Sequence, residues 1–176
     1  MWREAEIRDK KVQNLILEIQ KILVNLEPML RDVERILRNI RFFKDDVIEH
    51  YLGRESLIPL SNMKKEEIEN KYELYRFFEY KFYPYCIEPL ANFSSCIARF
   101  YYDLYDNPSE FCLRCGDSAV EFIKWDYSSL NPYYIELANQ LDDDCYKVFE
   151  KWNSAIPKIN ELKNYVEKLL NECKLL

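Results

Sequence analysis

The sequence predicts an all-α protein: a single-domain helical bundle in which two long, kinked, antiparallel terminal helices enclose about four shorter helices. Three observations predict this fold. The 176 residues include only two glycines and no threonine, whereas a β protein needs glycine in its turns and β-branched residues on its surface. Apolar residues recur every seven positions at both ends of the chain. The length suits one domain with its own core.

The N-terminal helix is predicted over residues 1–52. Apolar side chains occupy every seventh position, and others follow three and four positions later. Three apolar positions per heptad make a stripe that is wider than a two-stranded coiled-coil seam, which favours packing in a multi-helix bundle. We expect a bend at Pro28, because proline removes one backbone hydrogen bond. The leading positions of this series are Val12, Ile19, Leu26, Val33, Ile40 and Val47.

Residues 131–176 repeat this design and form the second predicted long helix. Asn131 is a suitable N-cap, and Pro132 fits the first helical position, where its missing N–H is not needed. If the two long helices are antiparallel with their heptads in register, Pro157 lies beside Pro28 and the two bends fall at the same level. The leading positions here are Ala138, Cys145, Trp152, Ile159, Val166 and Cys173.

The middle of the chain, residues 63–130, is predicted to form shorter helices. Residues 53–62 are the first expected loop, and Ser61 and Asn62 at its end are candidate caps. Pro84 should separate two helices, and two capping-box patterns, starting at Asn107 and Ser118, should each open another. The expected helices are residues 64–83, residues 85–106, about two turns from Asn107, and residues 118–130.

Charge and hydropathy exclude several classes of protein. The net charge is −6, and no segment has the basic excess of a nucleic-acid binder. The apolar runs are broken well short of the ~18 residues that a membrane span needs, and the N-terminus is charged rather than signal-like. We therefore expect a cytoplasmic protein that does not insert into membranes and carries no cofactor.

A row of arginines on the N-terminal helix is the one basic feature, and it suggests a nucleic-acid accessory protein as a minor alternative. Glutamates precede two of these arginines by four residues, the better orientation for ion pairs within a helix. A solvated, self-paired face is therefore the favoured interpretation. The row consists of Arg31, Arg35, Arg38 and Arg41.

Cys112 and Cys115 form a Cys-x-x-Cys pattern that is followed by Gly116. Because glycine commonly ends a helix in the left-handed conformation, we expect a helix to end here. Thiols at a helix C-terminus stay protonated, which argues against redox catalysis. A zinc site lacks a second close cysteine pair, and His50 is the only histidine.

The other four cysteines also give little support to a catalytic or zinc-binding role. Cys145 and Cys173 occupy core heptad positions and are expected to be small buried thiols. Cys86 and Cys96 could converge with the Cys-x-x-Cys pair, which would favour zinc, but the spacing is poor. Whether any of the six cysteines form disulfides is left open, because that depends on the redox compartment of the protein.

Two groups of carboxylates suggest an enzymatic alternative. The antiparallel register brings both groups to the same end of the bundle, where facing acidic pairs could hold Mg²⁺ against a nucleotide or a diphosphate. Their heptad positions point outward, however, so a solvated acidic end is the favoured interpretation. The first group is Asp45, Asp46 and Glu49, and the second is Asp142, Asp143, Asp144 and Glu150.

The middle segment is rich in tyrosine and phenylalanine on more than one helical face. A helix with several apolar faces is central in its bundle or is covered by a partner. We therefore expect a non-catalytic, regulatory or interaction protein that binds another protein or itself. The candidate interaction residues are Tyr72, Tyr75, Phe78 and Phe82.

Overall fold

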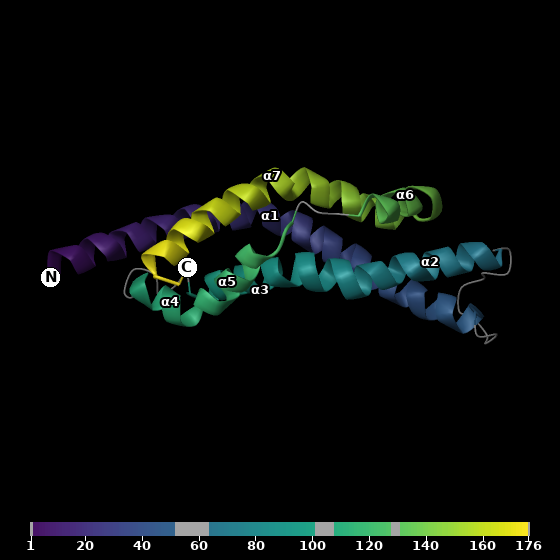
Figure 1. The fold of residues 1–176 in the computed structure, drawn as a ribbon, viewed down its shortest axis with the longest axis horizontal. Helices are drawn as coiled ribbons and strands as arrows, with labels where there is room; N and C mark the ends of the chain where they lie inside the picture. Colours follow the sequence, from purple (N-terminus) through teal and green to yellow (C-terminus); the bar gives the residue numbers. More distant parts are fainter. Residues whose placement is uncertain (1, 52–63, 101–107, 128–130, 176) are drawn as a thin grey trace. The chain divides into compact units, whose positions relative to one another are not determined.

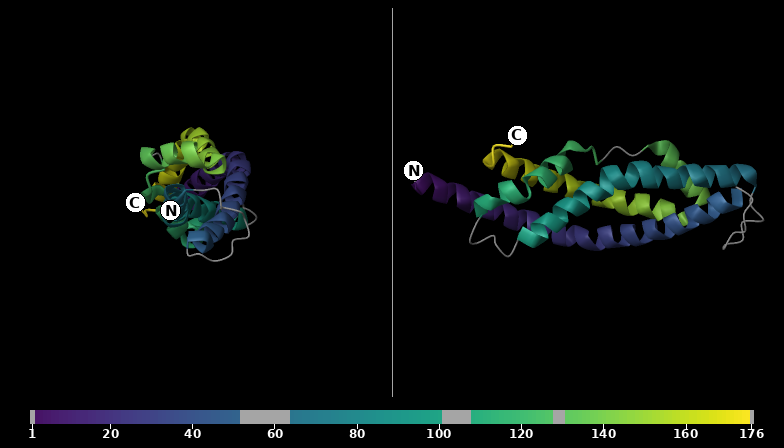
Figure 2. Two further views of the ribbon diagram at one scale, coloured as in Figure 1. Left: turned by 90° about the vertical axis from the view of Figure 1, so that its right-hand side faces the viewer. Right: turned by 90° about the horizontal axis from the view of Figure 1, so that it is seen from below.

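The structure, a computed structural model, describes residues 2–51, 64–100, 108–127 and 131–175. Within these ranges every regular element is helical, which confirms the all-α prediction (Figure 1). The same helices are seen from two further sides in Figure 2. In chain order they are α1 (Trp2–Tyr51), α2 (Lys65–Phe77), the π-helix η1 (Phe78–Ile87), α3 (Glu88–Phe100), the 3₁₀ turn η3 (Pro108–Glu110), α4 (Phe111–Arg114), α5 (Gly116–Lys124), α6 (Pro132–Leu141) and α7 (Asp143–Glu172).

The chain divides into two compact units. Unit 1 contains Met1–Pro28, Cys86–Tyr127 and Ala155–Leu176, and unit 2 contains Met29–Tyr85 and Ser128–Ser154. Each unit therefore takes one part of α1 and one part of α7. The single-domain organisation inferred from the sequence stays a prediction.

The two terminal helices pack together, as their heptads predict. All six leading positions of each series are buried except Cys173, which is half-buried. In unit 2 the ion pair between Lys151 Nζ and Asp32 Oδ2, at 3.2 Å, joins α7 to α1 and agrees with an antiparallel register. Both helices continue through their internal prolines, Pro28 and Pro157. The bends expected at these prolines stay predictions.

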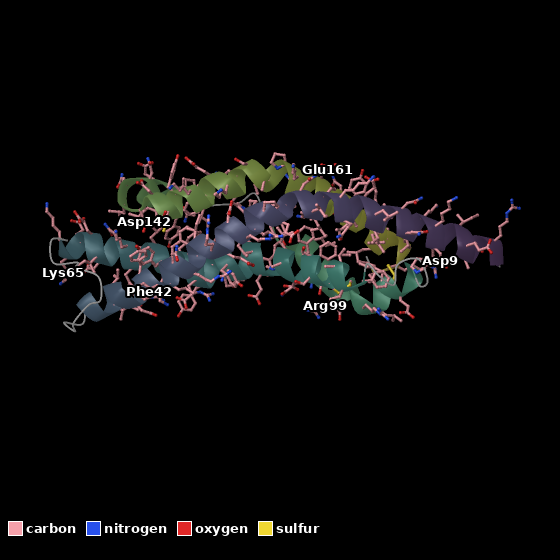
Figure 3. All side chains as sticks on the ribbon, turned by 180° about the vertical axis from the view of Figure 1, so that it is seen from behind. Asp9, Phe42, Lys65, Arg99, Asp142 and Glu161 are labelled. Atoms are coloured by element: carbon pink, nitrogen blue, oxygen red, sulfur yellow. A yellow bond between two sulfur atoms is a disulfide. The ribbon has the colours of Figure 1, made fainter. Side chains whose placement is uncertain are left out.

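The prediction of one uninterrupted helix over residues 131–176 is wrong, because Asp142 separates α6 from α7 (labelled in Figure 3). Its backbone is extended, with φ −153° and ψ 104°. Its Oδ1 accepts hydrogen bonds from the backbone N–H groups of Asp144 (3.0 Å) and Cys145 (3.2 Å). The Asp142 side chain thus caps the N-terminus of α7. Aspartate is favoured at an N-cap and is less favourable in the interior of a helix. The start of α6 is as predicted: Asn131 Oδ1 accepts from Tyr133 N, and Pro132 follows.

The prediction that Pro84 ends a helix is also wrong. The backbone stays helical from α2 into α3, and Pro84 lies inside the ten-residue π-helix η1. A proline in an α-helix removes one hydrogen bond and its ring collides with the preceding turn. The wider π turn, with its i to i+5 pattern, accommodates this residue without ending the helix. The expected caps Ser61 and Asn62 lie outside the described residues, and Lys64 is the N-cap of α2.

The short helices of unit 1 differ from the prediction around Gly116. A turn and a short helix do follow Pro108, but Cys115 is the C-cap of α4, and Gly116 is the first residue of α5 and does not end a helix. Ser118 lies inside α5 and does not cap it. Gly116 instead lies close to Leu175: a Cβ at position 116 would lie 2.7 Å from Leu175 Cδ1, so a larger residue would need the Leu175 side chain to move.

Four of the six cysteines form disulfides, a possibility that the sequence left open, so the thiols expected at Cys112, Cys115 and Cys173 are not found (Figure 3). Cys96 is bonded to Cys115 and Cys112 to Cys173, with Cα–Cα distances of 5.8 and 5.6 Å. Both distances are ordinary for disulfides. The free cysteines, Cys86 and Cys145, are buried as expected for small apolar side chains.

Candidate protein-binding surface

Three of the four aromatic residues selected from the sequence belong to the core of unit 2. Tyr75, Phe78 and Phe82 are at most 2% exposed, so they cannot contact a partner in this fold. Phe78 and Phe82 pack against Phe149 with ring centroids 5.0 and 6.1 Å apart. Tyr72 is 36% exposed, and it is the member of the predicted set that lies at the surface.

Unit 2 has further exposed aromatic residues besides Tyr72. The exposed rings on α2, η1 and α6 share a phenol group, which combines a large apolar face with a hydroxyl that tolerates water. Such residues are enriched in protein–protein interfaces. They are Tyr72, Tyr80, Tyr85 and Tyr133.

Arg76 connects two of these rings along the helix. Its guanidinium carbon lies 6.0 Å from the ring centroid of Tyr72 and 5.7 Å from that of Tyr80. Tyr72 precedes Arg76 by four residues and Tyr80 follows it by four, so the three side chains make a ladder on one face. The geometry is that of cation–π contacts, which hold the arginine and both rings in place.

A stacked pair of rings forms the apolar part of the same surface. Phe77 of α2 and Tyr134 of α6 have centroids 4.1 Å apart and planes inclined by 14°. On the neighbouring residues, the Tyr133 hydroxyl donates to Glu73 Oε2 at 3.4 Å. These contacts join α6 to α2, so the surface is built from two helices.

Between these side chains lies a shallow groove of about 270 Å³. Lys81 contributes the second cation of its lining. We call this surface the tyrosine groove, which consists of Tyr72, Glu73, Arg76, Phe77, Tyr80, Lys81 and Tyr134.

A partly buried hydrogen bond joins α2 to the start of α7. The Tyr75 hydroxyl donates to Asp142 Oδ2 at 2.7 Å and so ties α2 to the break between α6 and α7. Burial raises the pKa of Tyr75 far above its usual value of 10, and the negative charge of Asp142 and this hydrogen bond raise it further. The phenol therefore stays protonated and remains a donor.

The two acidic groups do not form a described metal site. Both oxygens of Asp142 are used, one by Tyr75 and one by the N-terminus of α7. Asp45, Asp143, Asp144 and Glu150 are exposed. The side chains of Asp46 and Glu49 lie outside the described residues. In the part of the chain that the structure describes, no three histidine, cysteine or acidic side chains gather in a way that could hold a metal ion.

The arginine row is exposed, and two of its members interact with this same chain. Arg35 forms an ion pair with Asp32 at 3.4 Å, and Arg41 lies 5.1 Å from the ring centroid of Tyr83. The ion pairs that the sequence predicts for Arg31 and Arg38 with the glutamates four residues before them stay predictions. The contacts of Arg35 and Arg41 leave the nucleic-acid alternative without a supporting observation.

Sequence reasoning missed most of the tyrosine groove. Arg76 and Tyr80 could have been found from the spacing of four residues that joins them to Tyr72. Tyr134 could not have been found in this way, because its contact with Phe77 depends on how α6 packs on α2.

Comparison with models of known protein families, with curated proteins and with solved structures found no match. Among the helices of the described residues, none has the length and apolar character that crossing a membrane requires. The groove is therefore interpreted from its own geometry.

Proposed function

We propose that this chain is a non-catalytic helical protein that binds a partner protein through the tyrosine groove. The observation that carries the proposal is the exposed Tyr72–Arg76–Tyr80 ladder beside the stacked pair of Phe77 and Tyr134. Tyrosine and arginine are the residue types that most often dominate the binding energy of an interface. Because the cation–π contacts already restrain these side chains, less conformational entropy is lost when they bind.

The charge of the groove indicates the chemistry of the partner. Arg76 and Lys81 line it, and its one acidic residue, Glu73, already accepts a hydrogen bond from Tyr133. The groove is therefore locally basic on a chain whose net charge is −6. A partner segment with an apolar side chain next to one or two carboxylates would complement it, with the carboxylate favouring fast association and correct register.

A peptide-display experiment tests this proposal directly. The purified chain is used to select binders from a phage library of random twelve-residue peptides. Selected peptides are expected to combine aspartate or glutamate with an apolar residue. Arg76→Ala and Tyr80→Ala should each weaken the binding of such a peptide about fivefold or more, since an interface anchor contributes more than ~1 kcal/mol.

Phe42→Ala is the matched control, because Phe42 is 56% exposed in unit 2 but does not line the groove. This variant should bind the selected peptides as tightly as the unmodified chain does. The proposal fails if the library yields no acidic binders, or if Arg76→Ala and Tyr80→Ala bind like the control. The magnesium-hydrolase and nucleic-acid alternatives stay predictions, and no observation in the structure favours either.

A further inference from the structure

The two disulfides converge on one turn of helix in unit 1. Cys112 lies in α4 and Cys115 follows at its C-cap, and each is bonded to a distant cysteine rather than to its neighbour. The Cys96–Cys115 bond joins α3 to the junction of α4 and α5. The Cys112–Cys173 bond joins α4 to the end of α7. The Cys-x-x-Cys pattern is therefore a point at which three parts of the chain are cross-linked.

The two bonds differ in their access to solvent. Cys112 and Cys173 are both half-buried, whereas in the other bond Cys96 is half-buried and Cys115 is fully buried. A thiolate must reach a sulfur atom in order to reduce a disulfide, so access controls which bond is attacked first. Both cysteines of the Cys112–Cys173 bond are open to attack, but only one cysteine of the Cys96–Cys115 bond is, so the Cys112–Cys173 bond is the more accessible of the two.

The segment held by this bond is a short turn at the end of α7. Lys174 has a left-handed backbone with φ 57°. Its N–H donates to Asn171 O, and the N–H of Leu175 donates to Leu170 O. This is the Schellman pattern of helix ends. The turn is held against α4 and α5 by the disulfide and by the Leu175 side chain over Gly116.

The free cysteines are poorly placed to exchange with these bonds. Cys86 and Cys145 are both buried. Burial raises the pKa of Cys86 to about 12 and raises that of Cys145 further. Because the thiolate is the attacking species, both groups are weak nucleophiles at neutral pH.

We propose that the C-terminal turn of α7 is a redox-sensitive latch, which closes when Cys112 and Cys173 are oxidised and opens when they are reduced. In the closing step a disulfide oxidant accepts two electrons and two protons from the two thiols and leaves as a dithiol; in the opening step a dithiol reductant supplies them. The S–S bond breaks, two thiols form, and the reductant leaves as its own disulfide. The Cys96–Cys115 bond stays closed during this step and keeps α3 joined to the α4–α5 junction. The latch is independent of the tyrosine groove, which lies in unit 2.

The disulfides of the latch also indicate the redox state of the compartment in which the protein functions. Disulfides of this kind persist in oxidising compartments, or in the disulfide-rich cytosol of some thermophiles. The closed latch therefore weighs against the ordinary reducing cytoplasm that the sequence suggested.

Stepwise reduction with dithiothreitol tests the proposal. Samples taken along a dithiothreitol series are alkylated, digested and analysed by mass spectrometry, while hydrogen exchange is followed on parallel samples. Cys112 and Cys173 should be labelled before Cys96 and Cys115. Exchange at residues 170–175 should accelerate about tenfold or more, as expected for local opening, while peptides from unit 2 keep their rates. Full reduction should lower the melting temperature by about 10 °C, as expected for a disulfide that closes a long loop.

The Cys112→Ser/Cys173→Ser double variant should show the open turn without any reductant, and Cys145→Ser is the control that should behave like the unmodified chain. If the double variant does not fold, the reduction series on the unmodified chain still decides. The proposal is overturned if Cys96 and Cys115 are labelled first or at the same time. It is also overturned if exchange at residues 170–175 is unchanged once Cys112 and Cys173 are labelled.

Discussion

The two units stabilise their cores by different means. Unit 1 contains both disulfides and smaller groups of rings, such as Phe93 stacked on Phe122 with centroids 5.4 Å apart. Unit 2 holds a continuous cluster in which Phe149 contacts several other rings, and its cysteine, Cys145, is free. A disulfide stabilises mainly by restricting the unfolded chain, whereas ring packing acts in the folded state.

This difference indicates why the candidate binding surface lies in unit 2. The ring cluster there continues from Phe149 to Phe77, and Phe77 stacks on Tyr134 in the groove. The core and the groove thus share one aromatic system. Removal of a ring from that core should therefore alter the structure of the groove, whereas reduction of the disulfides should not.

The largest effect should come from Phe149→Ala, which removes the ring that contacts Phe77, Phe78 and Phe82. Loss of a fully buried phenylalanine leaves a cavity and lowers the free energy of unfolding by about 3–5 kcal/mol. Urea titration measures this loss, and hydrogen exchange shows whether it is concentrated in unit 2. Phe93→Ala is the matched change in unit 1. Equal acceleration of exchange in both units by both variants would show that the two cores are not separable.

A smaller effect is expected for Tyr75→Phe, which removes the hydrogen bond to Asp142. At neutral pH the free energy of unfolding should fall by about 1–3 kcal/mol, because a partly buried carboxylate loses its donor. Urea titration at pH 7 measures this change.

The same variant has a signature at alkaline pH. The pKa of Tyr75 is raised in the folded state above its usual value of 10. Its contribution to stability is therefore fully present below about pH 10 and is lost as the pH rises above 10, where only the unfolded phenol ionises. Tyr75→Phe should make the alkaline loss of stability less steep by up to about 1.4 kcal/mol per pH unit. Tyr127→Phe should do the same in unit 1, because burial also raises the pKa of Tyr127. Unchanged slopes in both variants would contradict this account.

The smallest effect should be a gain in stability from Lys174→Gly. Lys174 adopts φ 57°, a conformation that is strained for a residue with a Cβ and not for glycine. The free energy of unfolding should rise by about 0.5–1 kcal/mol in thermal or urea unfolding of the oxidised protein. Glu167→Gly, at an exposed position inside α7, is the opposite control and should lower stability by a similar amount. A loss of stability in Lys174→Gly would refute the assignment of the turn.

The sequence predicted the long helices well because their heptads repeat over many turns, so that no single residue decides the outcome. The prediction was wrong where a single residue changes the backbone conformation within an apolar repeat. Asp142 caps a helix in the middle of an apolar heptad series. Pro84 lies inside a π-helix, and the apolar periodicity of the sequence does not indicate a π-helix. Disulfide partners such as Cys112 and Cys173 are 61 residues apart, and spacing alone does not reveal them.

The groove was hard to predict for a related reason. In a segment so rich in tyrosine and phenylalanine, composition does not tell a buried ring such as Phe82 from an exposed one such as Tyr80. Whether a ring is buried depends on which neighbouring helix covers its face, and this is determined by the tertiary packing.

The way in which unit 1 is assembled has a consequence during synthesis on the ribosome. Its three segments are far apart in the chain, and the last begins at Ala155. When Cys112 and Cys115 emerge, Cys96 is already available, but Cys173 is still to be translated. Until Cys173 is translated, Cys112 is without its native partner and can compete with Cys115 for Cys96. Correct pairing thus depends on the last part of α7 arriving before a wrong bond is locked in, so nascent chains stalled before Cys173 should accumulate the Cys96–Cys112 or Cys112–Cys115 bond.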